Sequence, residues 1–320
     1  MNERAEQGER DPEPSRTQVG LALGAVYVIW GSTYLAIRFA VETLPPFLMA
    51  GTRFVVAGAL LYAWRRAVGF PRPTARQWRA AAVVGALMLL GGNGGVVWAE
   101  QWLESGTAAL IVATVPFWMV LLDWLRPGGS APRASVWMGL LVGFAGVAIL
   151  LGEPRLGTRE VTAGLVILMS TVAWAVGSLY SRTAALPAPL LATAMQMLAG
   201  GAFLLLAGLL AGEPGTMDPA TFSSRSVLAL LYLIVFGSLI SYSAYVWLLR
   251  VTAPALASTY AYVNPVVAVI LGWLLAGERM NARVILSAAV IVGGVVLITT
   301  ARGPGRDRRR GAGPAPRRGT

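Results

Sequence analysis

Residues 111–124 read IVATVPFWMVLLDW, an apolar run with a proline, Pro116, at its centre and a carboxylate, Asp123, near its end. Proline in a helix interior removes a backbone hydrogen bond, and a charge inside an apolar run is costly where nothing solvates it. A membrane protein tolerates both features where the freed carbonyl or the charge faces protein or a water-filled cavity. The stretch therefore indicates a helix that lies in lipid.

The composition of the whole chain agrees with this interpretation. Of the 320 residues, 56% are hydrophobic and 13% are charged, whereas soluble domains carry about a quarter charged residues. Runs of about 20 apolar residues recur, and each is long enough to cross roughly 30 Å of hydrocarbon as a helix. We predict an all-α polytopic membrane protein with ten transmembrane helices, at residues 19–40, 47–64, 79–98, 106–125, 135–151, 161–181, 189–211, 227–249, 255–276 and 283–300.

The two ends of the chain differ from the spans in composition. Residues 1–18 mix Arg, Glu, Asp and Pro, and residues 302–320 are rich in Gly, Pro and Arg, so we expect both tails to be disordered. No cleavage site of a removed signal peptide is recognisable. The chain contains no His and no Cys, which removes disulfides and the usual ligands of zinc and haem; we expect no metal and no cofactor.

Arginine supplies every basic residue behind the net charge of +11. With ten spans, 19 of the 26 arginines fall on the side of the two tails and six on the other side. Such an excess marks the cytoplasmic side of a membrane protein. We expect a multi-pass protein of the cell (inner) membrane with both termini in the cytoplasm, and no nucleic-acid partner.

Rare residue types recur at one offset between the two halves of the chain. The pairs, each 149 residues apart, are Trp98 and Trp247, Pro116 and Pro265, and Trp124 and Trp273. Each half, 19–151 and 161–300, then holds five spans, and an odd number makes the second half enter the membrane from the opposite face. Inverted repeats are typical of secondary transporters, which bind substrate near the midplane between the repeats.

Pro116 and Pro265 both lie near the middle of their spans, Pro116 about 15 Å from the start of its helix. A proline frees a carbonyl and bends a helix. The pair therefore predicts hinges or cavity walls, with packing kinks as the alternative.

Three stretches resemble EamA-type permeases of the drug/metabolite transporter superfamily. They read WGSTYLAIRFAVETLPPFLMAGTRF at 30–54, GNGGVVWAEQWLESGTAALIVATVPFW at 92–118 and ALASTYAYVNPVVAVILGWLLAGERM at 255–280. The resemblance covers about residues 20 to 300 and implies an inner-membrane exporter of a small metabolite or drug, without implying which one. GERM at 277–280 has PGGS at 127–130 as its counterpart, so only one half carries the Glu-Arg pair.

Ionisable and amide side chains within the spans are the candidate binding groups. Arg53 lies roughly 10 Å below the outer face, Gln196 holds the matching position in the second half, and Asn93 and Glu100 share one face of the third span. We predict that Arg53, Asn93 and Gln196 bind substrate and that Glu100 is the partner of Arg53 and a proton site. A purely structural pairing of Arg53 with Glu100 is the alternative.

Asp123 is the second candidate proton site, and an interfacial charge beside Arg126 is its alternative interpretation. The other predicted substrate-binding residues are Trp30, Thr33, Trp98, Trp174, Tyr242, Tyr260 and Asn264. Aromatic walls suit flat, apolar or cationic solutes, whereas helix packing or hydrogen bonds between helices would also explain these residues. Small residues at 139, 143 and 146, with an echo at Ala289 and Gly293, predict close helix packing or a homodimer seam.

The sequence predicts a secondary transporter, an exporter that works by alternating access on a small-molecule substrate. It contains no GxxxxGK[ST] motif for ATP, and a proton relay without histidine would use carboxylates. Facilitated diffusion and exchange remain open. A lipid or amphiphile flippase of the same fold is the alternative function. A membrane-embedded enzyme would need clustered carboxylates, His or a Ser–Lys pair, which the sequence lacks, so we predict no enzyme.

Overall fold

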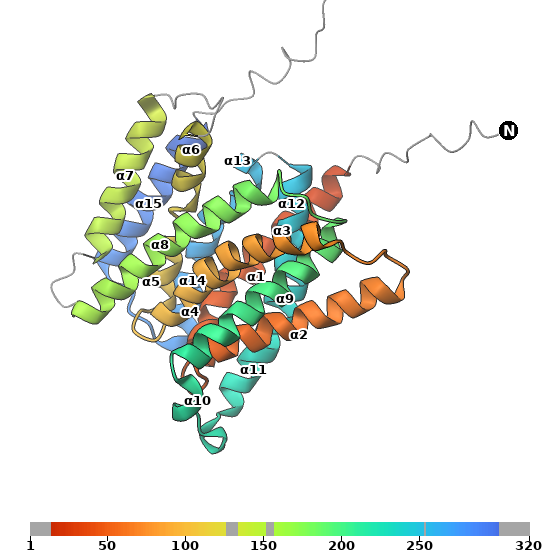
Figure 1. Ribbon diagram of the computed structural model, residues 1–320. Helices are drawn as coiled ribbons and strands as arrows, with labels where there is room; N and C mark the ends of the chain where they lie inside the picture. The colour runs from red at the N-terminus through yellow and green to blue at the C-terminus, as the bar shows by residue number, and fades with distance from the viewer. Residues whose placement is uncertain (1–13, 126–133, 152–156, 253, 301–320) are drawn as a thin grey trace, which may run out of the picture.

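Helices that alternate in direction make up the computed structural model, which describes residues 14–125, 134–151, 157–252 and 254–300 (Figure 1). No strand occurs within these ranges. The C-terminal tail from residue 302, residues 1–13 and the PGGS segment at 127–130 lie outside the described residues.

The first half contains α1 to α7. Their bounds are α1 (Arg16–Ala40), α2 (Pro46–Ala67), α3 (Ala75–Gly85), the π-helix η1 (Ala86–Gly94), α4 (Gly95–Ala99), α5 (Ser105–Val112), α6 (Val115–Leu125) and α7 (Ala134–Leu151). The segments α3, η1 and α4 follow one another without a gap and form one long helix.

The second half contains α8 to α15. Their bounds are α8 (Thr158–Ser181), α9 (Pro189–Leu210), α10 (Glu213–Thr216), the 3-10 turn η2 (Pro219–Thr221), α11 (Ser224–Tyr232), the π-helix η3 (Leu233–Tyr242), α12 (Ser243–Val251), α13 (Pro254–Ala257), α14 (Tyr260–Ala276) and α15 (Ala282–Thr300). In the described part of the chain, seven helical segments are long and apolar enough to cross a membrane, and three shorter apolar ones lie within α7, α14 and α15.

Polar caps make two helices begin earlier than hydropathy predicts. The Ser15 hydroxyl accepts a hydrogen bond from the Gln18 N–H, and the Gln18 side chain accepts one from the Ser15 N–H. Thr74 and Gln77 form the same reciprocal pair ahead of α3. A reciprocal pair of this kind is a capping box, and it provides hydrogen-bond acceptors for backbone N–H groups that have no partner in the first turn of the helix. The expectation that residues 16–18 are disordered is therefore wrong, because the capped helix α1 includes them.

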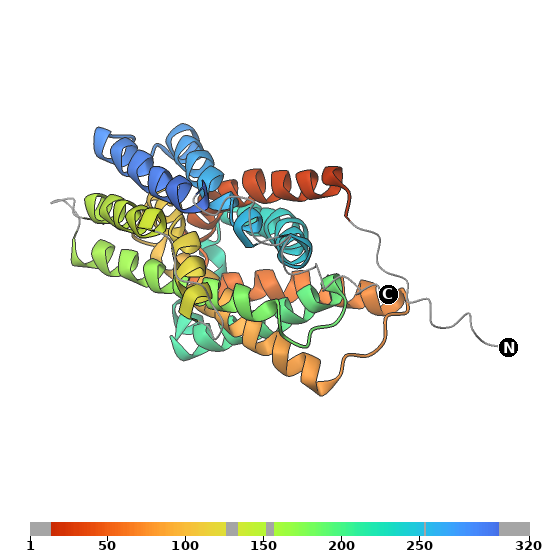
Figure 2. The same cartoon turned by 90° about the horizontal axis from the view of Figure 1, so that it is seen from above.

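Glycines let α2 and α9 pack backbone against backbone along their length (Figures 1 and 2). A Cβ added at Gly58 of α2 would lie 2.9 Å from the Leu198 nitrogen, and one added at Gly201 of α9 would lie 2.8 Å from the Val55 nitrogen. Small residues at such crossings allow the dispersion contacts that join helices in lipid.

The small residues of α7 pack against α15 within the same chain. A Cβ added at Gly146 would lie 3.0 Å from the Ile291 nitrogen, and one at Gly294 would lie 2.7 Å from the Gly139 oxygen. The sequence predicted that Gly293 would make this close packing, but a Cβ added at Gly293 would have no atom within 4 Å. The neighbouring Gly294 makes the contact instead. The seam that the glycines of α7 make is therefore intramolecular.

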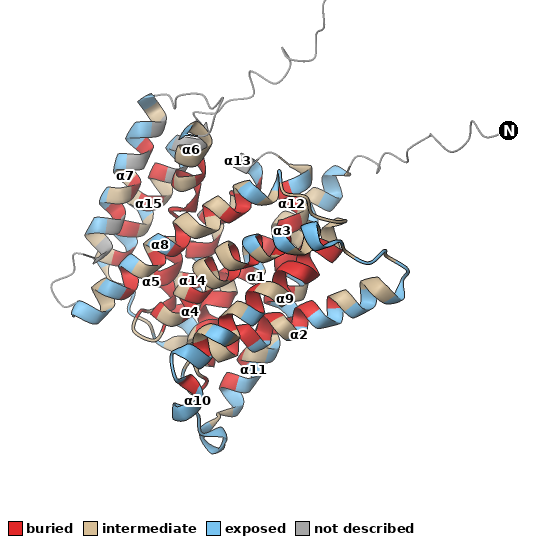
Figure 3. Cartoon of the chain, viewed as in Figure 1, coloured by how far each residue is buried: buried red, intermediate tan, exposed pale blue. Residues whose placement is uncertain are grey.

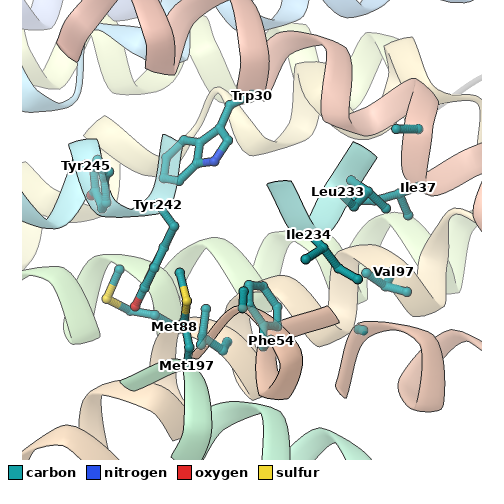
Figure 4. Close-up of a cluster of buried hydrophobic side chains, with 14 of the residues drawn as sticks. Trp30, Ile37, Phe54, Met88, Val97, Met197, Leu233, Ile234, Tyr242 and Tyr245 are labelled. Carbon is teal, nitrogen blue, oxygen red and sulfur yellow. The ribbon is translucent and has the colours of Figure 1, made fainter. Parts of the chain in front are cut away.

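Burial divides each helix into an inner and an outer face (Figure 3). Large apolar side chains remain exposed on the outer faces, for example Leu141 at 72% and Leu210 at 80%. Exposed apolar faces of this kind are expected where lipid replaces water as the solvent. Figure 4 shows the buried side, where Trp30, Phe54, Tyr242 and other apolar side chains from several helices meet at the centre of the bundle.

The two predicted hinge prolines have different surroundings. Residues 113 and 114 interrupt the fourth span between α5 and α6, and Pro116 is the second residue of α6. Helix α14 continues through Pro265, and the break in that span comes earlier, at residues 258 and 259. The structure thus places a break beside Pro116 only.

Candidate functional site

A cavity lies between the helices of both halves. Its water-accessible volume is about 70 Å³, several times the roughly 10–15 Å³ that one water needs on that measure. Aromatic walls come from Trp30, Tyr34, Phe54, Trp174, Tyr242 and Tyr260, and polar groups from Thr33, Arg53, Asn93, Ser170 and Thr171. A mostly apolar pocket with a few convergent polar groups is the usual form of a small-molecule site.

The cavity brings together seven of the ten predicted substrate-binding residues. They are Trp30, Thr33, Arg53, Asn93, Trp174, Tyr242 and Tyr260. Sequence reasoning missed Tyr34, Ser170 and Thr171, although hydroxyl groups within apolar spans were an available signal. Trp98, Gln196 and Asn264 do not line this cavity.

Arg53 is the cation of the cavity wall. Its side chain is 3% exposed, and its Nε donates a 2.8 Å hydrogen bond to the Ser238 hydroxyl. Its guanidinium carbon lies 4.6 Å from the centre of the Phe54 ring. Gly237 provides the space, because an added Cβ there would lie 2.7 Å from Arg53 Nη2. The Nη1 atom is buried without any hydrogen-bond partner, so this donor group is not used within the protein.

Glu100, the residue after α4, is fully buried, and neither of its carboxyl oxygens has a hydrogen-bond partner. Its backbone carbonyl accepts a 2.7 Å hydrogen bond from Arg38 Nη1. The predicted direct contact with Arg53 is not formed, because Arg53 uses its Nε on Ser238 instead. Burial without a donor favours the neutral form of a carboxyl group, whereas the nearby guanidinium groups of Arg38 and Arg53 favour the ionised form, so Glu100 has surroundings in which it can gain or lose a proton.

Four aromatic residues form a cluster on the side of the cavity toward the end of the bundle where α1 begins, here called the near face. Trp30 lies 5.5 Å from Trp174, 5.0 Å from Tyr245 and 5.3 Å from Tyr260, measured between ring centres. The Tyr245 hydroxyl is fixed by hydrogen bonds to Ser178 and to Trp174 Nε1, at 2.9 and 3.2 Å. These contacts join α1, α8, α12 and α14 into one buried layer.

The opposite end of the bundle, where α1 ends, is here called the far face. At this end, carboxylates of the second half bind helices of the first half. Glu278 accepts hydrogen bonds from the Ser105 N–H, the Ser105 hydroxyl and the Gly106 N–H at 2.8, 2.7 and 3.1 Å. Glu213 likewise accepts from the Phe47 and Leu48 N–H groups, at 3.0 and 2.8 Å. Each carboxylate thus sits at the N-terminus of a first-half helix, α5 or α2, where the helix dipole favours negative charge.

The GERM segment at 277–280 begins with a turn of the backbone. Gly277 adopts φ +65° directly after α14, a conformation that glycine reaches without strain. The turn brings the Glu278 N–H to within 3.1 Å of the Gly272 carbonyl and directs its side chain to α5. The glutamate of this motif therefore serves as a clamp between the halves.

The three predicted residues outside the cavity have other contacts. Gln196 Oε1 accepts a 2.9 Å hydrogen bond from the Tyr242 hydroxyl. The Asn264 amide nitrogen, oriented toward two carbonyls, donates to Tyr260 and Tyr27 at 3.2 and 3.0 Å. Trp98 packs against Trp102, with ring centres 4.5 Å apart, in a separate hollow at the far face. Asn264 thus connects α1 to α14, which is the packing alternative that the sequence left open.

Asp123, the second candidate proton site, lies half-buried in α6 and does not line the cavity. Its neighbour Arg126 falls outside the described residues. Glu100 does not line the cavity either, but it interacts electrostatically with Arg53 and Tyr34 of the cavity wall, so the geometry favours Glu100 over Asp123 as the carboxylate near the cavity.

Comparison with known proteins gives consistent results. A family model described as the EamA-like transporter family matches residues 18–152 and again 161–300. The chain is 44% identical over 279 residues to a protein of Escherichia coli (strain K12) named "Uncharacterized inner membrane transporter YedA", covering 87% of this chain and 89% of the relative. It is 22% identical over 288 residues to "Uncharacterized transporter YoaV" of Bacillus subtilis (strain 168), covering 88% and 97%. A crystal structure that is 23% identical shares the fold, with a TM-score of 0.65 over 90% of this chain and 99% of that one.

Proposed function

This chain belongs to the EamA-like transporter family and is a multi-pass membrane transporter of the inner membrane, and from this premise we propose that it exports a small metabolite or drug-like solute by alternating access. The observation that carries the proposal is the cavity itself, where a buried arginine and aromatic rings from both halves surround water-accessible space. Neither the family nor its relatives' names point to an enzyme.

The proposed architecture is ten transmembrane helices in two inverted repeats, 19–151 and 161–300, with both termini cytoplasmic. Three matches between the halves support it. Both α2 and α9 begin with a proline, Pro46 or Pro189, and both contain 22 residues. Each half has one long helix with a π-helical segment inside, η1 or η3, a feature that often marks functional sites. The family model also matches the chain twice.

The proposed binding groups are the seven predicted residues that line the cavity, with Gln196 acting through Tyr242. Glu100 is the proposed proton site. Since the sequence offers no ATP motif, a solute or ion gradient would supply the energy.

A flippase of the same fold is the second candidate function. Arg53 and Asn93 favour a water-soluble solute, because both residues line the cavity and each has a buried polar atom without a hydrogen-bond partner.

Cysteine labelling can test the proposed pathway, because the natural chain contains no cysteine. Thr33 lines the cavity, whereas Val28 on the same helix is 62% exposed on the outer face of the bundle. We expect a membrane-impermeant thiol reagent to label Thr33→Cys and not the lipid-facing Val28→Cys. Metabolite profiles of cells that lack or overproduce the protein would then identify the solute. Equal labelling of both positions would contradict an aqueous pathway along α1.

Replacing Pro116 by alanine is expected to slow transport about tenfold or less while leaving the protein folded. The alanine N–H can restore a helical hydrogen bond across residues 113 and 114 and so stiffen the break between α5 and α6. Pro265→Ala is the matched variant, and we expect a smaller effect because α14 is already continuous. Transport rates normalised to folded protein measure both. Equal rates for the wild type and Pro116→Ala would show that the break is a packing feature.

A further inference from the structure

Two polar groups of the cavity wall lack the partners that burial normally requires. Arg53 Nη1 has no hydrogen-bond acceptor, and the Asn93 amide oxygen has no donor. Both residues line the cavity. Buried polar atoms are nearly always paired with protein, water or a ligand. An unpaired donor on a cation calls for an anionic acceptor, and an unpaired amide oxygen calls for an N–H or O–H donor.

The cavity contains one cation and no anion in contact with it. Among the described residues that line it, Arg53 is the only charged one, and its Nε donates a hydrogen bond to the neutral Ser238 hydroxyl. The aromatic side of the wall, including Trp30 and Tyr242, would accommodate a flat apolar group beside the charge. A solute with a single anionic group matches this arrangement, whereas a dianion would retain one uncompensated charge.

The nearest candidate counterion of Arg53 within the protein is Glu100, which lies behind the cavity wall and has no donor at either carboxyl oxygen. The other charged or titratable groups that face Glu100 are Arg38 and Tyr34 from α1 and Glu278 from the loop before α15. Arg38 directs its Nη1 to the carbonyls of residues 100 and 103 and not to the Glu100 carboxyl group.

Arg53 can therefore be balanced in two ways. With the cavity empty of solute, an ionised Glu100 compensates the positive charge through space. With an anion on Arg53 Nη1, an ionised Glu100 would be a surplus negative charge in a buried place, which favours its protonation. Binding of the anion then raises the affinity for the proton, and binding of the proton raises the affinity for the anion by the same factor, because both act on the charge of Arg53.

We propose that the cavity selects solutes that carry one carboxylate-like anionic group next to a flat apolar ring, and that such a solute is bound together with one proton held on Glu100. This inference rests on the proposed transport function. The proton comes from water when the solute binds and returns to water when the solute dissociates, so that no bond in the solute is changed.

Binding of phenylacetate, its neutral isostere phenylacetamide and the dianion phenylmalonate to the purified full-length protein at neutral pH tests the proposal. We expect phenylacetate to bind at least tenfold tighter than either of the other two. Its affinity should rise as the pH falls, by up to about tenfold per unit, because one proton accompanies each anion. Equal affinity for the acid and the amide, affinity that is constant or falls as the pH is lowered, or no binding of any probe overturns the proposal.

Three variants separate the roles of the two residues. Arg53→Gln should bind the acid no better than the amide, whereas Arg53→Lys, which keeps the charge, should retain the preference and protects the test against a folding defect. Glu100→Gln should bind phenylacetate with an affinity that no longer depends on pH. A pH dependence in Glu100→Gln equal to that of the wild type contradicts the assignment. Labelling of Thr33→Cys does not depend on charge, so normal labelling together with failed anion selection would reject this inference and leave the proposed function standing.

Discussion

Replacing Gly85 by valine is expected to remove the protein from the folded, membrane-extractable pool. A Cβ at this position would lie 2.7 Å from the Gln196 carbonyl oxygen and 2.8 Å from the Gly200 nitrogen. Both are backbone atoms of α9, so no side chain can move aside. The junction of α3 and η1 would have to separate from α9, which sacrifices the packing between them. Overpacking in a core costs about 1–3 kcal/mol, and the loss of the helix contact adds to it.

The measurement is the yield of monodisperse protein in detergent together with its midpoint of thermal unfolding. Gly24→Val is the matched control, since Gly24 lies on α1 with nothing within 4 Å of an added Cβ. Gly85→Val should give little or no monodisperse protein, and Gly24→Val should resemble the wild type. If both variants unfold at the wild-type temperature, the close approach of α3 to α9 does not exist in the membrane.

The helix positions followed from sequence because lipid imposes one strict rule. Every backbone polar group in the hydrocarbon must be satisfied within its own helix, so the length of an apolar run sets the length of a span. The start of α2 at Pro46 and of α9 at Pro189 follows from proline's fixed φ and missing N–H. The π-helical segments and the break at residues 113 and 114 were not predicted, because contacts with neighbouring helices determine them, and hydropathy does not record those contacts.

The cavity residues were predictable to the extent that burial decides their direction. A polar side chain such as Arg53 or Asn93 is too costly to face lipid, so it must point inward. Pointing inward does not reveal what the side chain meets there. Asn264 obeys the same rule and is satisfied by the carbonyls of two helices, and only the three-dimensional arrangement distinguishes it from Asn93.

The far-face clamp escaped prediction for a related reason. Glu278 was visible in the sequence as part of an unmatched Glu-Arg pair, but its partners, Ser105 and Gly106, lie more than 170 residues earlier. Sequence spacing carries no information on that contact. The clamp also gives a physical meaning to the asymmetry between the halves, because a carboxylate of the second half anchors a helix of the first.

Titration of a neighbouring group should make the strength of this clamp depend on pH. Glu104 precedes α5, outside the spans, and burial together with the charge of Glu278 raises its pKa, against the hydrogen bond from the Arg279 N–H, which lowers it. A raised pKa means that folding is favoured below the ordinary value of 4.5, and that this contribution is lost as the pH rises through the folded-state pKa. The free energy of unfolding should therefore decrease as the pH rises above 4.5 and Glu104 ionises. The decrease should be smaller in a Glu278→Gln variant, which lacks the charge of Glu278.

Replacing Glu278 by glutamine should lower the free energy of unfolding by about 2 kcal/mol, because a helix cap contributes roughly 0.5–2 kcal/mol and an anion at a helix N-terminus adds about 0.3–1. The amide can accept through only one atom, so its NH₂ group would oppose the N–H of either Ser105 or Gly106. Glu213→Gln should have a similar effect through Phe47 and Leu48.

Asp218→Asn is the control for the clamp, since Asp218 caps only the short turn η2 within its own segment. We expect it to change stability by less than about 0.5 kcal/mol. Because the two glutamates join opposite halves of the chain, their loss should also favour opening at the far face, visible as faster labelling of Thr33→Cys from that side. Reduced stability without any change in labelling would mean that Glu278 holds α5 in place but does not restrain the movement of one half against the other.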